Sequence, residues 1–488
     1  MRPAFSNVEK IWPTGCDFHS SRLREEVQAR EYEGAEVPKE LMELVRGLRR
    51  FEDYPEEILW EMHKCLQALP LRADFHYEQP YDLEAIRKAR PHRDRRDLRS
   101  AVKESEVLDR IHGGWSLRLA GNILGIPVEG MAACSSGHGG IDAGTPRHGR
   151  AVMRNFLKPR GEWPLRDYFE MTAPDTWPEL WTPEYPDCCR GNIKYARTDD
   201  DTRLTLVNLE ILERFGRDFQ WWQVANFWNA CLTMRMVCTA ELQALLNFNM
   251  RSGMWVFPPE RVTRFVTPEF TSGYNNPYRE WVGAVNRADG FGFACAGMPE
   301  LAARLAWEDA HWTHRANGIY GEMLIAAAEA AAFATQDYDE ILDIALGEIP
   351  ENCRLAEEVR WMRRTMPAFP DFLSWAEEMD RRYNGMHIVH AVPNVIATLS
   401  AVHFAKGDPD QAICNAVMAC YDTDSAAASA GGIAGIMAGR HDLKGTLVEP
   451  LNDTFASGLL NEPQFLSVKD LAQRHFDQWR LLAEHAAR

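Results

Sequence analysis

The sequence predicts an all-α protein whose helices pack closely through small side chains. Almost every long segment has apolar residues at helical spacing, and runs of alternating strand residues are scarce. Several helical segments are rich in Ala and Gly. A hydrophobic content of 45% with 10% aromatic residues is ample for a sizeable core.

Four segments carry the helical pattern most clearly. The first has the pattern of two amphipathic helices broken by a proline, and the second is charged at first and then becomes apolar and small. The last two are rich in Ala. In chain order the segments are residues 38–69, 82–125, 300–334 and 394–421.

Two other segments, residues 131–197 and 253–280, break this pattern because they are rich in Gly, Pro and Trp. Each predicts a long irregular loop. Loops of this length inside a compact domain are usually functional or disordered, and the many Trp and Tyr residues favour ordered, functional loops.

The charge and cysteine content exclude several classes of protein. The net charge of −17 argues against a nucleic-acid-binding surface and against attraction to an anionic membrane, although a phosphate-bearing small ligand remains compatible. The eleven cysteines show no zinc-type spacing. Together with the absence of a signal peptide, they predict a soluble protein of the reducing cytoplasm.

Two acidic motifs carry the candidate chemistry. "TDDDT" (Thr198 to Thr202) places three carboxylates directly before an amphipathic helix. "DTDS" (Asp422 to Ser425) places two before a Gly- and Ala-rich helix. Residues at i and i+2 do not share a helix face, so an irregular entry loop is expected to let Asp422 and Asp424 converge.

Two explanations of these motifs stay open at this point. One acid at each helix start can cap the helix, which stabilises it by about 0.5–2 kcal/mol. The remaining acids gain little from capping and repel one another. If the two loops meet, their carboxylates cannot all stay ionised without a cation, and Mg²⁺ or Mn²⁺ prefers such oxygen ligands.

A third segment, "GNILGIPVEG", ends an apolar small-residue helix and then presents Glu129. For any single glutamate, a solvated position after a helix C-cap is the simpler explanation. The rigid turn at Pro127 also suits a carboxylate that is held at a site.

These three segments, in this order, resemble the ADP-ribosylglycohydrolase family. "GNILGIPVEG" resembles the family's Gly-x-x-x-Gly-x-Pro-x-Glu helix end, and "TDDDT" its Thr/Ser-Asp-Asp-Thr metal loop. "DTDSAAASAGGIAGIMAG" resembles its Asp-Thr-Asp-Thr helix start, and the Thr313-His314 pair lies in a similar segment between them. The resemblance covers about residues 110–440.

The resemblance implies an orthogonal helical bundle that carries two Mg²⁺ (or Mn²⁺) ions. It makes Asp422, Asp424 and Ser425 metal ligands, with Ser425 in place of the family's Thr but keeping its hydroxyl.

The first acidic loop has two possible registers on the family motif. In one register Asp199, Asp200 and Asp201 are the ligands, and in the other Thr198, Asp199 and Asp200. The apolar pattern "RLTLVNL" after the motif favours the first register slightly.

The remaining site residues are also implied by the resemblance. Glu129 and Asp200 are expected to be catalytic, with Glu129 orienting or activating the attacking water. His314, Gly290 and Gly292 are expected to bind the substrate.

The function expected from this resemblance is that of a divalent-metal-dependent hydrolase. Its substrate would be a ribosyl glycosidic bond, most simply that of an ADP-ribosylated molecule. Asn122 stands where the family usually has Asp, and "ADGFGFACAG" replaces the family's Met-Arg substrate loop, so the leaving group stays open. The alternatives are a hydrolase of another nucleoside-like N-glycoside and a non-catalytic binding or immunity protein on the same scaffold.

The expected domain division has three parts. Residues 1–105 form a helical N-terminal extension that offers a surface to a protein partner, residues 106–445 form the catalytic domain, and residues 446–488 form a C-terminal helical tail.

Overall fold

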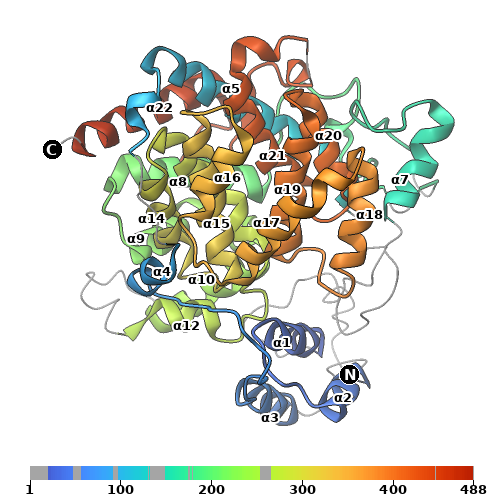
Figure 1. Ribbon diagram of the computed structural model, residues 1–488, viewed down its shortest axis with the longest axis vertical. Helices are drawn as coiled ribbons and strands as arrows, with labels where there is room; N and C mark the ends of the chain where they lie inside the picture. Colours follow the sequence, from blue (N-terminus) through green and yellow to red (C-terminus); the bar gives the residue numbers. More distant parts are fainter. Residues whose placement is uncertain are drawn as a thin grey trace, which may run out of the picture.

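The computed structural model of the chain is all-α, as the sequence predicts (Figure 1). It describes residues 20–47, 56–91, 97–129, 131, 149–173, 176–177, 180–252, 265–445 and 447–486. In this described part, the strands form one two-stranded antiparallel sheet of β1 (Thr454–Ala456) and β2 (Phe465–Ser467).

The helices follow one another along the whole chain. Before the first acidic motif lie α1 (Ser20–Tyr32), α2 (Lys39–Gly47), α3 (Glu56–Gln67), α4 (Leu83–Ala89), α5 (Glu104–Gly125) and α7 (Gly149–Leu157). From that motif onward lie α8 (Asp200–Phe215), α9 (Trp221–Cys231), α10 (Thr239–Ser252), α12 (Pro268–Gly273), α13 (Asp289–Gly292), α14 (Pro299–Ala310), α15 (Asn317–Ala332), α16 (Tyr338–Leu346), α17 (Arg354–Thr365), α18 (Phe372–Arg382), α19 (Ala391–Ala405), α20 (Pro409–Met418), α21 (Thr423–Ala438) and α22 (Val468–Ala486). None of the helices described is both long and apolar enough to cross a membrane.

The four segments with the clearest helical pattern are confirmed as helices. They correspond to α2 with α3, α4 with α5, α14 with α15, and α19 with α20. Each pair matches a segment in which the apolar spacing changes phase, which is where one helix ends and the next begins.

The two segments predicted to be irregular contain helices. Residues 132–148 and 253–264 of these segments lie outside the described residues. In the described remainder, α7 and α12 are helical. In α7, the buried side chains Met153, Phe156 and Leu157 lie at spacings of three and four, so tertiary packing stabilises a helix that the surrounding Gly and Pro content concealed.

The centre of the molecule is formed by α5, α15, α19 and α21, with the other helices around them (Figure 1). Every residue of α15 is buried, and so are thirteen of the fifteen residues of α19. Their Ala-rich composition follows from this position, because small side chains allow helices on several sides to pack closely.

Helices α5 and α21 run antiparallel with their backbones in close contact. A Cβ atom at Gly121 would lie 2.2 Å from the carbonyl oxygen of Ala427, and one at Gly431 would lie 2.4 Å from that of Leu117. Neither position therefore accepts a larger residue without separating the helices. The C-terminal end of α5 is brought to the N-terminal end of α21, where the second acidic motif begins.

The N-terminal helices α1, α2 and α3 lie together at one end of the molecule (Figure 1). They share a small hydrophobic core of their own, formed by Leu23, Val27, Val45, Leu59 and Leu66. The three helices are called the N-terminal unit below. The proposed boundary of this extension near residue 105 remains a prediction.

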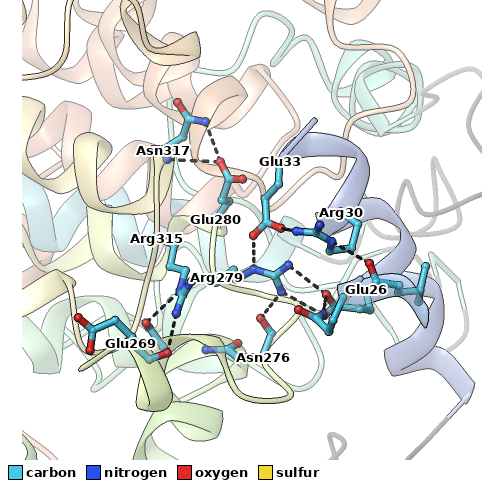
Figure 2. A network of polar contacts seen from close by, with 12 residues as sticks. Glu26, Arg30, Glu33, Glu269, Asn276, Arg279, Glu280, Arg315 and Asn317 are labelled. Carbon is cyan, nitrogen blue, oxygen red and sulfur yellow. Dashed lines mark hydrogen bonds and ion pairs between the residues drawn. The ribbon is translucent and has the colours of Figure 1, made fainter. Parts of the chain in front are cut away.

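A buried ionic network joins the N-terminal unit to the rest of the protein (Figure 2). The guanidinium of Arg279 donates two hydrogen bonds of 3.0 Å to the Glu26 carboxylate and also pairs with Glu33. Arg30 of α1 pairs with the same Glu33. Burial opposes the ionisation of Glu33, but Arg279 and Arg30 outweigh it and lower the pKa of this carboxyl to about 2.

We expect Arg279→Gln to lower the free energy of unfolding by about 3–5 kcal/mol, because it leaves buried carboxylates without their cation. Urea denaturation at pH 7 measures the change. Since the pKa of Glu33 is lowered from 4.5, the contribution of Glu33 to the free energy of unfolding is present above pH 4.5 and is lost as the pH falls toward 2. Arg381→Gln is the control, because its pair with Glu378 is exposed and contributes less than about 1 kcal/mol. Equal, small losses in both variants would contradict the role of the network.

Candidate functional site

Three segments that are far apart in sequence place their carboxylates together. Carboxylate oxygens of Glu129, Asp422 and Asp424 all lie within 4.8 Å of one another. The same limit holds for a second group, formed by Asp199, Asp201 and Asp424. Asp424 belongs to both groups, so the two acidic motifs and Glu129 form one continuous cluster, called the acidic cluster below.

The local backbone explains how each motif reaches this position. Glu129 follows directly after a short 3₁₀ helix (Ile126–Val128) that continues α5 past Pro127. Asp422 and Asp199 are the residues before α21 and α8, and both have extended backbones. Each helix therefore begins at the acidic cluster and directs the positive end of its dipole toward the carboxylates.

Asp199 does not cap its helix with its side chain, although it occupies the N-cap position of α8. Its Oδ2 atom instead accepts a hydrogen bond of 2.7 Å from Nδ2 of Asn122. Helix capping by its side chain therefore does not explain why an acidic residue stands at position 199.

Asp201 and Ser425 are connected directly across the site. Ser425 Oγ donates a hydrogen bond of 3.1 Å to Asp201 Oδ2. Nδ2 of Asn286 donates to this hydroxyl at 2.9 Å and also to Asp201. Asn286 thus fixes the first acidic motif against the second. The sequence offers no signal for this role, because a single asparagine in a short 3₁₀ helix (Val282–Arg287) belongs to no pattern.

Asp200 and Thr198 have different surroundings. The Cys238 thiol is hydrogen-bonded to Asp200, and the charge of Asp200, followed by burial, raises the pKa of this thiol and keeps it protonated. The Thr198 hydroxyl donates to the carbonyl of Ser457 at 3.1 Å and accepts hydrogen bonds from Arg203. These contacts occupy the Thr198 hydroxyl. Asp199 and Asp201 share a three-carboxylate group, whereas Asp200 belongs to neither group, so the ligand register stays a prediction.

The acidic cluster opens into a cavity of about 150 Å³. Its acidic wall contains Glu129, Asp199, Asp200 and Asp424. The same cavity is lined by Tyr185 and by the arginines Arg197, Arg203 and Arg235. Tyr185 and Arg197 come from the loop that the sequence marks as ordered and functional, although their individual roles could not be read from it.

Nearby arginines offset the charge of the acidic cluster only in part, because burial raises the pKa values of Asp200 and Asp201 while Arg203 and Arg118 oppose this rise. Among the residues described, none of its carboxylates forms an ion pair with Lys or Arg. Burial, and then the negative charges of neighbouring carboxylates, raise the pKa values of Glu129, Asp200, Asp201 and Asp424. Burial also raises the pKa of Asp422. The cluster can ionise fully only if a cation from solution enters it, and its oxygen ligands suit Mg²⁺ or Mn²⁺.

Three residues expected to bind substrate lie elsewhere. His314 is completely buried beside Thr313 and Glu241. Gly290 and Gly292 are also buried, and a Cβ atom on either would collide with Asn208 or Glu329. None of the three lines the 150 Å³ cavity. Their placement indicates helix packing rather than substrate contact, because close approach of α13 to α8 and α15 requires the glycines.

Comparison with known proteins gives one family. Residues 103–483 match the ADP-ribosylglycohydrolase family, a span that includes the whole acidic cluster. A solved structure described as an "ADP-ribosylglycohydrolase-related protein complex" aligns with 77% of this chain and 99% of that chain, with 17% identity and a TM-score of 0.43. No curated protein matches the chain.

We expect Asp424→Ala to distinguish cation binding from helix capping. In chelator the variant should be as stable as the wild type or more so, because a repelled buried charge is removed. In Mg²⁺ the free energy of unfolding should rise for the wild type alone, by about 2.7 kcal/mol when the free Mg²⁺ concentration exceeds Kd 100-fold. Differential scanning calorimetry with and without Mg²⁺ measures both effects.

Asp371→Ala is the matched control, since Asp371 caps α18 through Ser374 at the surface. Its free energy of unfolding should be lower than that of the wild type by about 1 kcal/mol, equally in Mg²⁺ and in chelator. If Asp424→Ala behaves in the same way, the acidic cluster does not bind cations.

Proposed function

Because the chain belongs to the ADP-ribosylglycohydrolase family, we propose that it is a divalent-metal-dependent glycosidase that hydrolyses the ribosyl bond of an ADP-ribosylated substrate. The observation that carries the proposal is the position of Asp424, which lies in both three-carboxylate groups. A carboxylate placed in this way would contribute an oxygen ligand to a divalent cation held by either group, and such a cation would supply hydrolytic chemistry there.

The residues that would hold the cations are those of the acidic cluster. Glu129, Asp422 and Asp424 supply one group of oxygens, and Asp199, Asp201 and Asp424 supply the other. Bound divalent cations neutralise these carboxylates and make a bound water more acidic. Ser425, held by Asn286 beside Asp201, adds a hydroxyl oxygen at the junction of the two groups.

The protein residues then direct the hydrolysis. Glu129 lines the cavity and is partly exposed, so it can accept a proton from the attacking water. The water oxygen forms a bond to the anomeric carbon, and the electron pair of the breaking glycosidic bond leaves with the departing group. Asp200 also lines the cavity, where its negative charge stabilises the positive, oxocarbenium-like ribosyl group.

The arginines that line the same cavity as the carboxylates favour a phosphate-bearing substrate over a simple nucleoside. Arg197 is already paired with Asp187, and Arg203 donates to Thr198 and to the carbonyl of Met236. Arg235 is exposed and, within the described part of the chain, forms no ion pair. A guanidinium in this state can pair with a substrate phosphate at the edge of the cavity.

The substrate class is tested by measuring hydrolysis of ADP-ribosyl-arginine, ADP-ribosyl-serine, O-acetyl-ADP-ribose and unphosphorylated nucleosides. Each is assayed with Mg²⁺, with Mn²⁺ and with chelator. Release of ADP-ribose that requires a divalent cation supports the proposal. Equal rates in chelator, or turnover of nucleosides alone, would overturn it.

We expect Glu129→Gln to lower the rate of hydrolysis at least about 100-fold, because the amide cannot accept the proton of the attacking water. Stabilisation by Mg²⁺ should persist, since five carboxylates of the acidic cluster remain. The control is Glu184→Gln, which replaces an exposed glutamate next to Tyr185 that does not line the cavity. A Glu129→Gln protein with the wild-type rate would remove Glu129 from the mechanism.

A further inference from the structure

A second, larger cavity of about 770 Å³ lies at the opposite ends of α5 and α21. Asp109 and His112 of α5 line it, together with Arg440 and His441, which follow α21 in a 3₁₀ helix (Arg440–Leu443). The acidic cluster lies beyond Gly125 at the other end of α5. At 1.5 Å per helical residue, the two sites are about 20 Å apart.

The side chains lining this second cavity differ in character from the acidic cluster. Five of its nine lining residues carry basic nitrogen atoms, and three others, Asp109, Glu449 and Asp453, carry carboxylates. The five basic residues are His112, Arg440, His441, Lys444 and Lys469.

The carboxylates of the second cavity are occupied by protein donors. Asp453 accepts hydrogen bonds of 2.8 Å from His112 Nε2 and 2.9 Å from Ser467 Oγ. Asp109 accepts one of 3.2 Å from the backbone N–H of His441. Within the described residues, Lys444 and Lys469 have no carboxylate partner, so their charges are available to a ligand.

The backbone at Asn452 and Asp453 forms a left-handed turn, a conformation that Asn and Asp adopt more readily than other non-glycine residues. Asn452 and Asp453 are consecutive, and both have a φ of 51°. Hydrogen bonds from Asn452 Nδ2 to the carbonyls of Lys194 and Pro450 maintain this turn. The turn places the Asp453 carboxylate against His112 at the cavity wall.

We propose that this second cavity binds a phosphate-bearing small molecule, at a site separate from the acidic cluster. The second cavity is an open depression on the surface, so a ligand bound there would stay largely exposed to solvent. Lys444 and Lys469 supply the charge-assisted hydrogen bonds that a phosphate group requires, while Arg440 lies 4.0 Å from the Glu449 carboxylate. His441 adds a further donor at the edge, while Asp453 fixes the ring of His112.

Isothermal titration calorimetry with pyrophosphate, ADP and adenosine tests the proposal on the full-length chain in chelator at low ionic strength. Chelator removes cations from the acidic cluster, and variants of Lys444 and Lys469 separate binding at the second cavity from pairing of phosphate with Arg235 at the first. Pyrophosphate and ADP are expected to bind and adenosine is not. Tighter binding of ADP than of pyrophosphate would show that the base is contacted as well.

The double variant Lys444→Gln/Lys469→Gln is expected to weaken pyrophosphate binding at least about tenfold, the loss of one charged hydrogen bond or more. The matched control is Lys88→Gln/Lys158→Gln, which removes two exposed lysines outside the cavity and should change Kd by less than about twofold. All four lysines are exposed, so both proteins should fold as the wild type does, with equal melting temperatures.

The proposal is overturned if the two double variants weaken binding equally, if adenosine binds as well as ADP, or if pyrophosphate and ADP fail to bind at millimolar concentration. The measurement needs neither a metal ion nor hydrolysis. Its result is therefore independent of the function proposed for the acidic cluster.

Discussion

The close contact between α5 and α21 is the constraint on which the acidic cluster depends. At Gly125 a Cβ atom would lie 2.4 Å from Cα of Asp424, so the last turn of one helix rests directly on the first turn of the other. The Thr423 hydroxyl closes the contact by donating to the carbonyl of Gly125 at 2.9 Å. With the helices at this distance, a chain that leaves α5 through Pro127 brings Glu129 to Asp422 and Asp424. Larger residues at the glycines would widen the gap and separate the carboxylates.

Neutral amides orient the carboxylates that these helices bring together. Asn122 and Asn286 donate to Asp199 and Asp201, and Oδ1 of Asn394 accepts the backbone N–H of Asp422 at 3.0 Å. An amide fixes the direction of a carboxylate without cancelling its charge. Asn122 illustrates the point, because an aspartate at that position would repel Asp199 rather than hold it.

The sequence allowed much of the fold to be predicted, since helical periodicity and Ala-rich segments are local properties. The sequence also indicated that two acidic motifs and Glu129 form the candidate site, because it shows an unusual number of acidic residues at the start of two helices. It could not assign Gly290 and Gly292, since a glycine that lets helices touch and one that admits a ligand look the same in sequence. Asn286 and the arginines that line the cavity depend on long-range packing, for which a single sequence contains no signal.

Some of the other buried acids of the protein differ from the acidic cluster because they form ion pairs with arginines. Arg279 neutralises Glu26 and Glu33 beneath the N-terminal unit. Arg287 does the same for Glu241 and Asp309. These two arginines each pair with two carboxylates. In contrast, buried Glu280 accepts a hydrogen bond from Asn317, and buried Glu329 faces Asp289.

Arginines are also close to the acidic cluster, but they are directed away from its carboxylates. Arg118 donates to the backbone carbonyl of Asp201 at 3.0 Å, yet its ion pair, at 2.7 Å, is with Asp289. Arg203 is used to hold Thr198. The carboxylates of the acidic cluster therefore repel one another strongly, although several guanidinium groups lie nearby. A cation bound from solution would reduce this repulsion. The stability of the site would then depend on the same cation that the proposed hydrolysis requires.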